Sequence, residues 1–105
     1  MVDQPNSDGM TPLLLAASKP DGGILSQLLR AGANPNGTSP RHGATALMAA
    51  AEFRRHDNVT LLLEAGADVT ISTRGGDTAL GIASDDGIKA QLRAAYAKRL
   101  GADGL

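Results

Sequence analysis

Two histidines and a small group of aspartates are the residues whose types could support metal binding or acid–base chemistry. His42 and His56 are fourteen positions apart, which is not the i,i+3 or i,i+4 spacing of a helical metal-binding pair. Asp77, Asp85 and Asp86 lack the alternating pattern of oxygen ligands that a calcium loop requires. We therefore predict surface histidines, an aspartate of the adjacent pair that caps a helix N-terminus, and no metal site.

Nucleophilic and phosphate-binding motifs are also missing. The chain has no cysteine and no Gly-x-Ser-x-Gly sequence. Gly75-Gly76 with Gly81 does not make a phosphate-binding loop, because the lysine and the preceding strand that such loops need are absent. This glycine pair is typical of a tight turn. The sequence therefore predicts a protein that is not an enzyme and holds no cofactor.

Composition and charge exclude further classes of partner. The 105 residues suffice for one domain, and 10 basic against 11 acidic residues give a net charge of −1. One Phe, one Tyr and no Trp provide few rings for base stacking, so we expect no nucleic acid partner. The start of the chain has neither a basic nor an apolar run, and residues 13–17 are too short an apolar stretch to span a bilayer. We expect a cytoplasmic protein with no membrane contact.

The residues considered so far are set in an internal repeat. A Gly-x-Thr sequence places Thr11, Thr45 and Thr78 at intervals of 34 and 33 residues. A second marker, Leu-Leu-x-Ala-Gly-Ala, occupies residues 28–33 and returns at 62–67, again with an offset of 34. Two markers in one register indicate a genuine repeat, and a period of this length is typical of stacked supersecondary units.

Each repeat predicts two helices. The threonines can cap first helices over about 11–18, 45–53 and 78–84. Gly32 and Gly66 fall where a second helix would end in a left-handed residue, and 33–42 and 67–75 are predicted turns. The second helices carry apolar stripes at one-face helical spacing: Ile24, Leu25, Leu28 and Leu29; Val59, Leu62 and Leu63; Ile88, Leu92, Ala95 and Tyr96.

These lines resemble the ankyrin repeat, whose pattern is Gly-x-Thr-Pro-Leu-His-x-Ala-Ala, a leucine-rich helix and Gly-Ala-Asp. The resemblance covers roughly residues 7–100. It implies an all-α solenoid of three stacked antiparallel helix pairs with projecting hairpin turns. The domain is then expected at 9–100, with repeats at about 9–40, 41–73 and 74–100. A flexible N-terminal segment at 1–8 and a tail at 101–105 would flank it.

The chain departs from the family pattern in four places. The histidine position holds Leu14, Met48 and Gly81, so the hydrogen bond that this histidine usually supplies between repeats is expected to be absent. Pro40 replaces a hairpin aspartate, with one extra residue nearby, and Arg54-Arg55 replaces Gly-His between two helices. The third repeat is shortened before its second helix.

The two ends of the predicted stack differ. The last helix has a polar outer set, as a terminal cap should: Lys89, Gln91, Arg93, Lys98 and Arg99. The first repeat opens with Met10, Leu14 and Leu15, and residues 1–8 offer no comparable cap. We therefore expect either a longer protein or a contact that covers this N-terminal flank.

The resemblance implies a non-catalytic module that binds another protein through its concave helix face and hairpin tips. Phe53 is either an edge-packing residue or an anchor for the partner, and the basic group Arg41-His42 with Arg54-Arg55-His56 is either a solvated cluster or a contact patch. The predicted groove is basic around one aromatic ring and acidic at its C-terminal end. A small inhibitory or regulatory subunit of an enzyme or toxin, and an accessory domain of a larger enzyme, are the alternatives. The positions that the resemblance assigns to partner binding are Met10, Ser18, Lys19, Arg41, His42, Ala44, Glu52, Phe53, Arg74, Asp77, Asp85 and Asp86.

Overall fold

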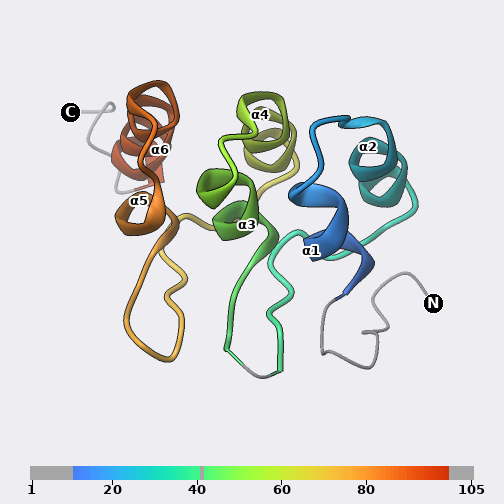
Figure 1. Cartoon of the computed structure of the whole chain (residues 1–105), viewed down its shortest axis with the longest axis horizontal. Helices are drawn as coiled ribbons and strands as arrows, with labels where there is room; N and C mark the ends of the chain where they lie inside the picture. Colours follow the sequence, from blue (N-terminus) through green and yellow to red (C-terminus); the bar gives the residue numbers. More distant parts are fainter. Residues whose placement is uncertain (1–10, 41, 100–105) are drawn as a thin grey trace.

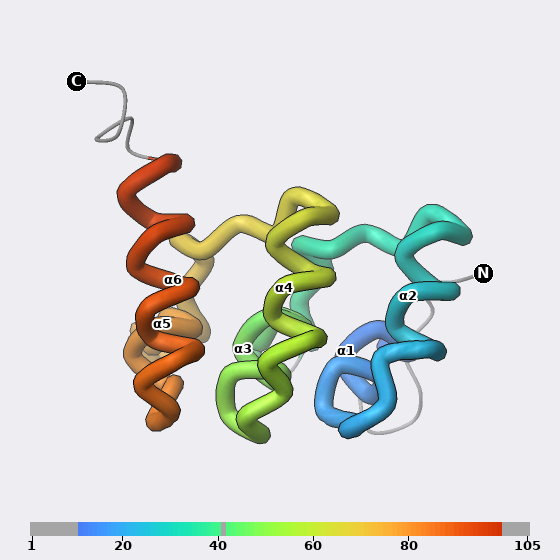
Figure 2. The backbone as a smooth tube through the Cα atoms, turned by 90° about the horizontal axis from the view of Figure 1, so that it is seen from above, coloured from blue at the N-terminus to red at the C-terminus, as the bar shows by residue number. Residues whose placement is uncertain are grey.

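Six helices in three pairs make up the described part of the chain. The computed structural model describes residues 11–40 and 42–99. The helices are α1 (Pro12–Ala17), α2 (Gly23–Arg30), α3 (Ala46–Glu52), α4 (His56–Glu64), α5 (Ala79–Ile82) and α6 (Asp86–Arg99). The pairs stand side by side, with long loops on the side of α1, α3 and α5 (Figure 1). Seen from above, α2, α4 and α6 form a second row (Figure 2). Extended pairing in this part of the chain is limited to one bridge between Ser72 and Thr78, which confirms the all-α prediction.

The predicted helix ends are confirmed by their hydrogen bonds. The hydroxyls of Thr11, Thr45 and Thr78 accept the backbone N–H three residues later, at 3.2, 3.3 and 3.2 Å. Gly32 and Gly66 have φ of 94° and 92°, the left-handed region that glycine enters without steric cost. The three threonines and two glycines therefore fix where each helix begins or ends.

The core lies between the two rows of helices and consists mainly of leucine and alanine. Leu25, Leu47 and Leu62 are fully buried there, as are Ile88 and Leu92 of α6. One predicted member of the apolar stripes differs, because Ile24 is 61% exposed. Its counterpart 34 residues later, Asn58, is buried against α1. No repeat precedes α1 and α2 among the described residues, so Ile24 has no equivalent repeat to pack against.

Polar contacts join the first two repeats. The amide nitrogen of Asn58 donates to the carbonyls of Ala17 and Lys19 at 2.9 and 2.8 Å. Between these two residues, the carbonyl of Ser18 accepts from Arg55 Nε at 2.8 Å. Repeat two thus satisfies the carbonyls at the C-terminus of α1, which have no partner inside that helix.

The junction of repeats two and three relies on pairs of side chains. Gln91 Nε2 donates to Thr60 Oγ1 at 2.7 Å. His56 Nε2 lies 3.1 Å from a carboxylate oxygen of Asp85, and Arg99 lies 3.1 Å from Asp68.

The two described hairpins share a hydrogen-bond pattern in spite of the extra residue near Pro40. The Ser39 N–H donates to the Ala44 carbonyl at 2.8 Å, and the Thr73 N–H donates to the Asp77 carbonyl at the same distance. The backbone N–H of Arg74 donates to the carbonyl of His42 at 3.1 Å, which ties one hairpin to the next.

Within the described ranges, none of the helices is long and apolar enough to cross a membrane.

Candidate protein-binding groove

A groove lies between the inner helices and the hairpins, with a volume of about 530 Å³. We call it the hairpin-side groove. Its lining residues are Leu14, Ser39, His42, Ala44, Met48, Ala49, Glu52, Phe53, Thr73, Arg74, Gly75, Asp77 and Ile82. Half of the predicted partner-binding positions are among them: His42, Ala44, Glu52, Phe53, Arg74 and Asp77. The two hairpins that hold part of this lining are joined by the backbone hydrogen bond from Arg74 to His42.

Phe53 lies at the C-terminal end of α3, outside the core. Its backbone N–H donates to the Ala49 carbonyl at 3.1 Å, and Arg54 follows with φ of 60°. The side chain is 49% exposed and does not belong to the core cluster. This exposure excludes a core position, and it fits both an edge-packing residue and an anchor for a partner.

Local hydrogen bonds order the polar rim of the hairpin-side groove. The guanidinium of Arg74 donates to the Pro40 carbonyl at 2.7 Å, and the N–H of Asp77 donates to Thr73 Oγ1 at 3.2 Å. Glu52 and Asp77 contribute negative charge, whereas Arg74 contributes positive charge. The rim is therefore mixed in sign.

Arg54 and Arg55, which the sequence suggested as basic neighbours of Phe53, line a different and smaller cavity. This cavity also contains Pro20, His56, Asp57 and Asn58. Arg55 is engaged with the Ser18 carbonyl, so it takes part in the junction of two repeats.

The remaining predicted positions lie elsewhere. Ser18 and Lys19 follow the end of α1, where their carbonyls accept from repeat two. Asp85 and Asp86 lie at the start of α6 and do not line the hairpin-side groove. Their role in partner binding stays a prediction, as does that of Met10 and Arg41, which lie outside the described residues together with the predicted segments 1–8 and 101–105.

The predicted cap by an aspartate is confirmed at Asp85. Its Oδ1 accepts the backbone N–H of Ile88 at 3.0 Å, at the first turn of α6. This hydrogen bond lowers the pKa of the Asp85 carboxyl below its ordinary value. Burial opposes it in part, and the contact with His56 lowers the pKa further. A helix N-terminus stabilises the ionised carboxylate.

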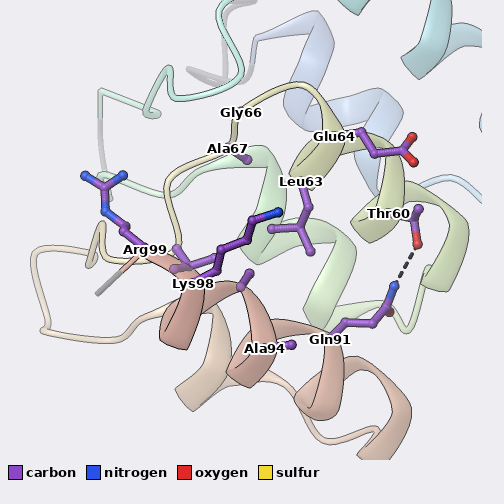
Figure 3. A pocket seen from close by; sticks show the side chains of 11 residues that line it. Thr60, Leu63, Glu64, Gly66, Ala67, Gln91, Ala94, Lys98 and Arg99 are labelled. Carbon is purple, nitrogen blue, oxygen red and sulfur yellow. Dashed lines mark hydrogen bonds between the residues drawn. The ribbon is translucent and has the colours of Figure 1, made fainter. Parts of the chain in front are cut away.

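A second groove was not predicted from the sequence. It lies between α4 and α6, has a volume of about 640 Å³, and shares no lining residue with the hairpin-side groove (Figure 3). In the sequence, the small residues Ala94-Ala95 on α6 and Gly66-Ala67 after α4 are the feature that could have indicated this groove.

Among the described residues, no group of three His, Cys, Asp or Glu side chains could hold a metal ion.

The three stacked helix pairs and the internal repeat are typical of a helical repeat protein. Comparison with known sequences supports this class. The family described as ankyrin repeats (3 copies) matches residues 1–73 and again 23–96. The chain therefore belongs to the ankyrin-repeat family, whose repeats are protein–protein interaction modules.

Individual relatives are much longer than this chain. It is 40% identical over 78 residues, 74% of its length, to rat (Rattus norvegicus) ankyrin repeat and SAM domain-containing protein 6. It is 36% identical, over its whole length, to the nuclear factor NF-kappa-B p105 subunit of Mus musculus. It is also 44% identical over 77 residues, 73% of its length, to protein PhlB of Serratia liquefaciens. The chain spans 9%, 11% and 34% of these three proteins, respectively.

Proposed function

We propose that this chain is a non-catalytic module that binds a partner protein in the hairpin-side groove and on the hairpin tips. The observation that carries the proposal is the half-exposed ring of Phe53, held beside an apolar floor that includes Leu14, Met48 and Ile82. Binding energy at protein interfaces concentrates in aromatic and arginine anchors near the centre of the contact. Phe53 and Arg74 are such residues on one groove.

The rim of this groove suggests the chemistry of the partner segment. An apolar side chain of the partner would pack on Phe53, while charged groups on either side would meet Glu52 and Asp77 or Arg74. A partner surface with charges of both signs therefore suits the groove better than a uniformly acidic one. The proposal includes a cytoplasmic location, which the lack of cysteine favours.

The substitution Phe53→Ala tests the proposal. We expect it to cost about 2 kcal/mol of binding free energy or more, in the range of an interface hot spot. The free energy of unfolding should fall by less than about 1 kcal/mol, because the side chain is already half exposed. Affinity capture from the source lysate would identify the partner, and titration calorimetry and urea denaturation would then measure the two quantities.

Ile24→Ala is a matched control, because it also truncates an exposed apolar side chain but lies outside the groove. It should leave the affinity unchanged. A large loss of stability with unchanged affinity for Phe53→Ala would mean that the residue is structural and that the partner binds elsewhere. A single tight partner that is itself an enzyme or toxin would identify the chain as a regulatory subunit.

A further inference from the structure

The groove between α4 and α6 has apolar walls that leave space for a side chain. Toward the start of α6, Ile88 and Leu92 are fully buried. Further along, α6 presents Ala94 on the side of Leu63 of α4 (Figure 3), and Ala95 also lines the groove. Because alanine reaches less far than leucine or isoleucine, the two helices leave an opening there, wide enough for an aliphatic side chain.

One end of this groove offers a hydrogen-bond acceptor with no partner. Thr60 Oγ1 donates its proton to the His56 carbonyl at 3.2 Å and accepts from Gln91 Nε2 at 2.7 Å. Because the hydroxyl proton is already used, the nitrogen of the Gln91 amide must face Thr60, and this fixes the orientation of the amide. Gln91 Oε1 is then a buried acceptor, and it has no hydrogen-bond partner among the described residues. Such an atom is stabilised when an N–H or O–H group reaches it.

The other end of the groove offers a positive charge. Arg99 is paired with Asp68 at 3.1 Å, whereas Lys98 has no ion pair within the described part of the chain. Lys98 extends across the groove toward Leu63, and the Glu64 carboxylate points away from it (Figure 3). A carboxylate of a bound molecule could therefore reach Lys98 without meeting Glu64.

We propose that the α4–α6 groove is a second binding site, which takes an extended peptide segment with an aliphatic side chain beside a carboxylate. The aliphatic side chain packs between Leu63 and Ala94. A backbone N–H of the segment donates to Gln91 Oε1, and the carboxylate pairs with Lys98. A peptide carries a backbone N–H, an apolar side chain and a carboxylate close together. The groove offers a partner for each of them: Gln91 Oε1, the opening beside Leu63, and Lys98. The site is separate from the hairpin-side groove, so the chain would hold two segments at once.

Nuclear magnetic resonance titration of the ¹⁵N-labelled chain with the capped peptide acetyl-Gly-Leu-Glu-Gly-amide tests this site. We expect saturable shifts of the amides of Leu63 and Ala94 and of the Gln91 side chain, with a Kd of about 1 mM, as is usual for a short flexible ligand. Peptides with Gln in place of Glu, or with Ser in place of Leu, should bind at least about threefold more weakly. Equal binding of these peptides, or shifts that do not saturate, would contradict the proposal.

Variants of the chain separate the site from its surroundings. Lys98→Gln should weaken the peptide about fivefold, the effect of one exposed charge pair. Arg93→Gln is the matched control on α6, because Arg93 is exposed and does not line the groove. Ala94→Leu fills the opening at an exposed helical position, so the fold should persist while peptide binding is lost. Phe53→Ala should not alter the titration. If it abolishes the shifts, the peptide occupies the hairpin-side groove and the second site is wrong, whereas the proposed function stands.

Discussion

Arg54 has a left-handed backbone conformation, with φ of 60°, in the loop between α3 and α4. Residues with a Cβ atom are strained there, by about 1 kcal/mol or more. We expect Arg54→Gly to raise the free energy of unfolding by about 1 kcal/mol, measured by urea denaturation. Arg54→Ala removes the long side chain but keeps the Cβ atom, so it should give no comparable gain. Equal stability of the two variants would show that the backbone conformation is not the cause.

Asn58 is a residue whose role depends on a neighbouring repeat. Asn58→Ala would leave the carbonyls of Ala17 and Lys19 without their donor at a buried position, so we expect a loss of about 2 kcal/mol in the free energy of unfolding. Thermal or urea denaturation would measure it. Glu64→Ala, at the exposed C-terminal end of the same helix, should change stability by less than about 0.5 kcal/mol. A similar small change in both variants would contradict the assigned role of Asn58.

At the scale of elements, the start of α6 couples stability to pH. The pKa of the Asp85 carboxyl is lowered in the folded state, chiefly by the hydrogen bond from the Ile88 N–H. The folded state therefore binds this proton less readily than the unfolded state, and the contribution of Asp85 to stability is present above about pH 4 and lost as the pH falls below it. Asp85→Asn should be less stable than the unaltered chain at pH 7. The gap should narrow as the pH falls below about 4, in denaturation curves recorded over a series of acidic pH values. A gap that is constant with pH would contradict this assignment.

The helices and their ends could be predicted from the sequence because local chemistry determines them. The hydroxyl of Thr45 needs only the N–H of Met48, three residues away, and Gly66 needs only its own freedom at positive φ. At one departure from the family pattern, the Met48 sulfur accepts the Thr45 N–H at 3.4 Å, a contact within the repeat that the sequence did not suggest.

The contacts between elements could not be predicted in the same way. Arg55 was assigned with Arg54 to a basic patch, yet it donates to Ser18, which is 37 residues distant in sequence. The groove between α4 and α6 also escaped prediction, since it depends on how closely two helices approach. Half of the predicted partner-binding positions line one groove, because repeat positions transfer from one unit to the next. Their role in binding stays a prediction.

At the scale of the whole molecule, the first repeat packs against one other repeat within the described part of the chain. In α2 only Leu25 is fully buried, whereas Ile24 is 61% exposed and Leu28 and Leu29 are half-buried. Repeat three also has one described neighbour, but its α6 fully buries Ile88 and Leu92. We therefore expect the amides of α1 and α2 to exchange with deuterium faster than those of α6 in the isolated chain. Faster exchange in repeat three would contradict this expectation. A contact that covers Ile24 should slow exchange in α2 first.

The contacts at the two junctions between repeats differ in how strongly they depend on the identity of both residues. At the first junction, Asn58 and Arg55 bind main-chain carbonyls, which every amino acid has, so these contacts do not depend on the side chains of Ser18 and Lys19. At the second junction, Thr60 pairs with the Gln91 side chain, and His56 pairs with that of Asp85. A change in either partner there removes the contact. In homologous chains, a substitution of Thr60 should therefore be accompanied by a substitution of Gln91. A substitution of His56 should likewise be accompanied by one of Asp85.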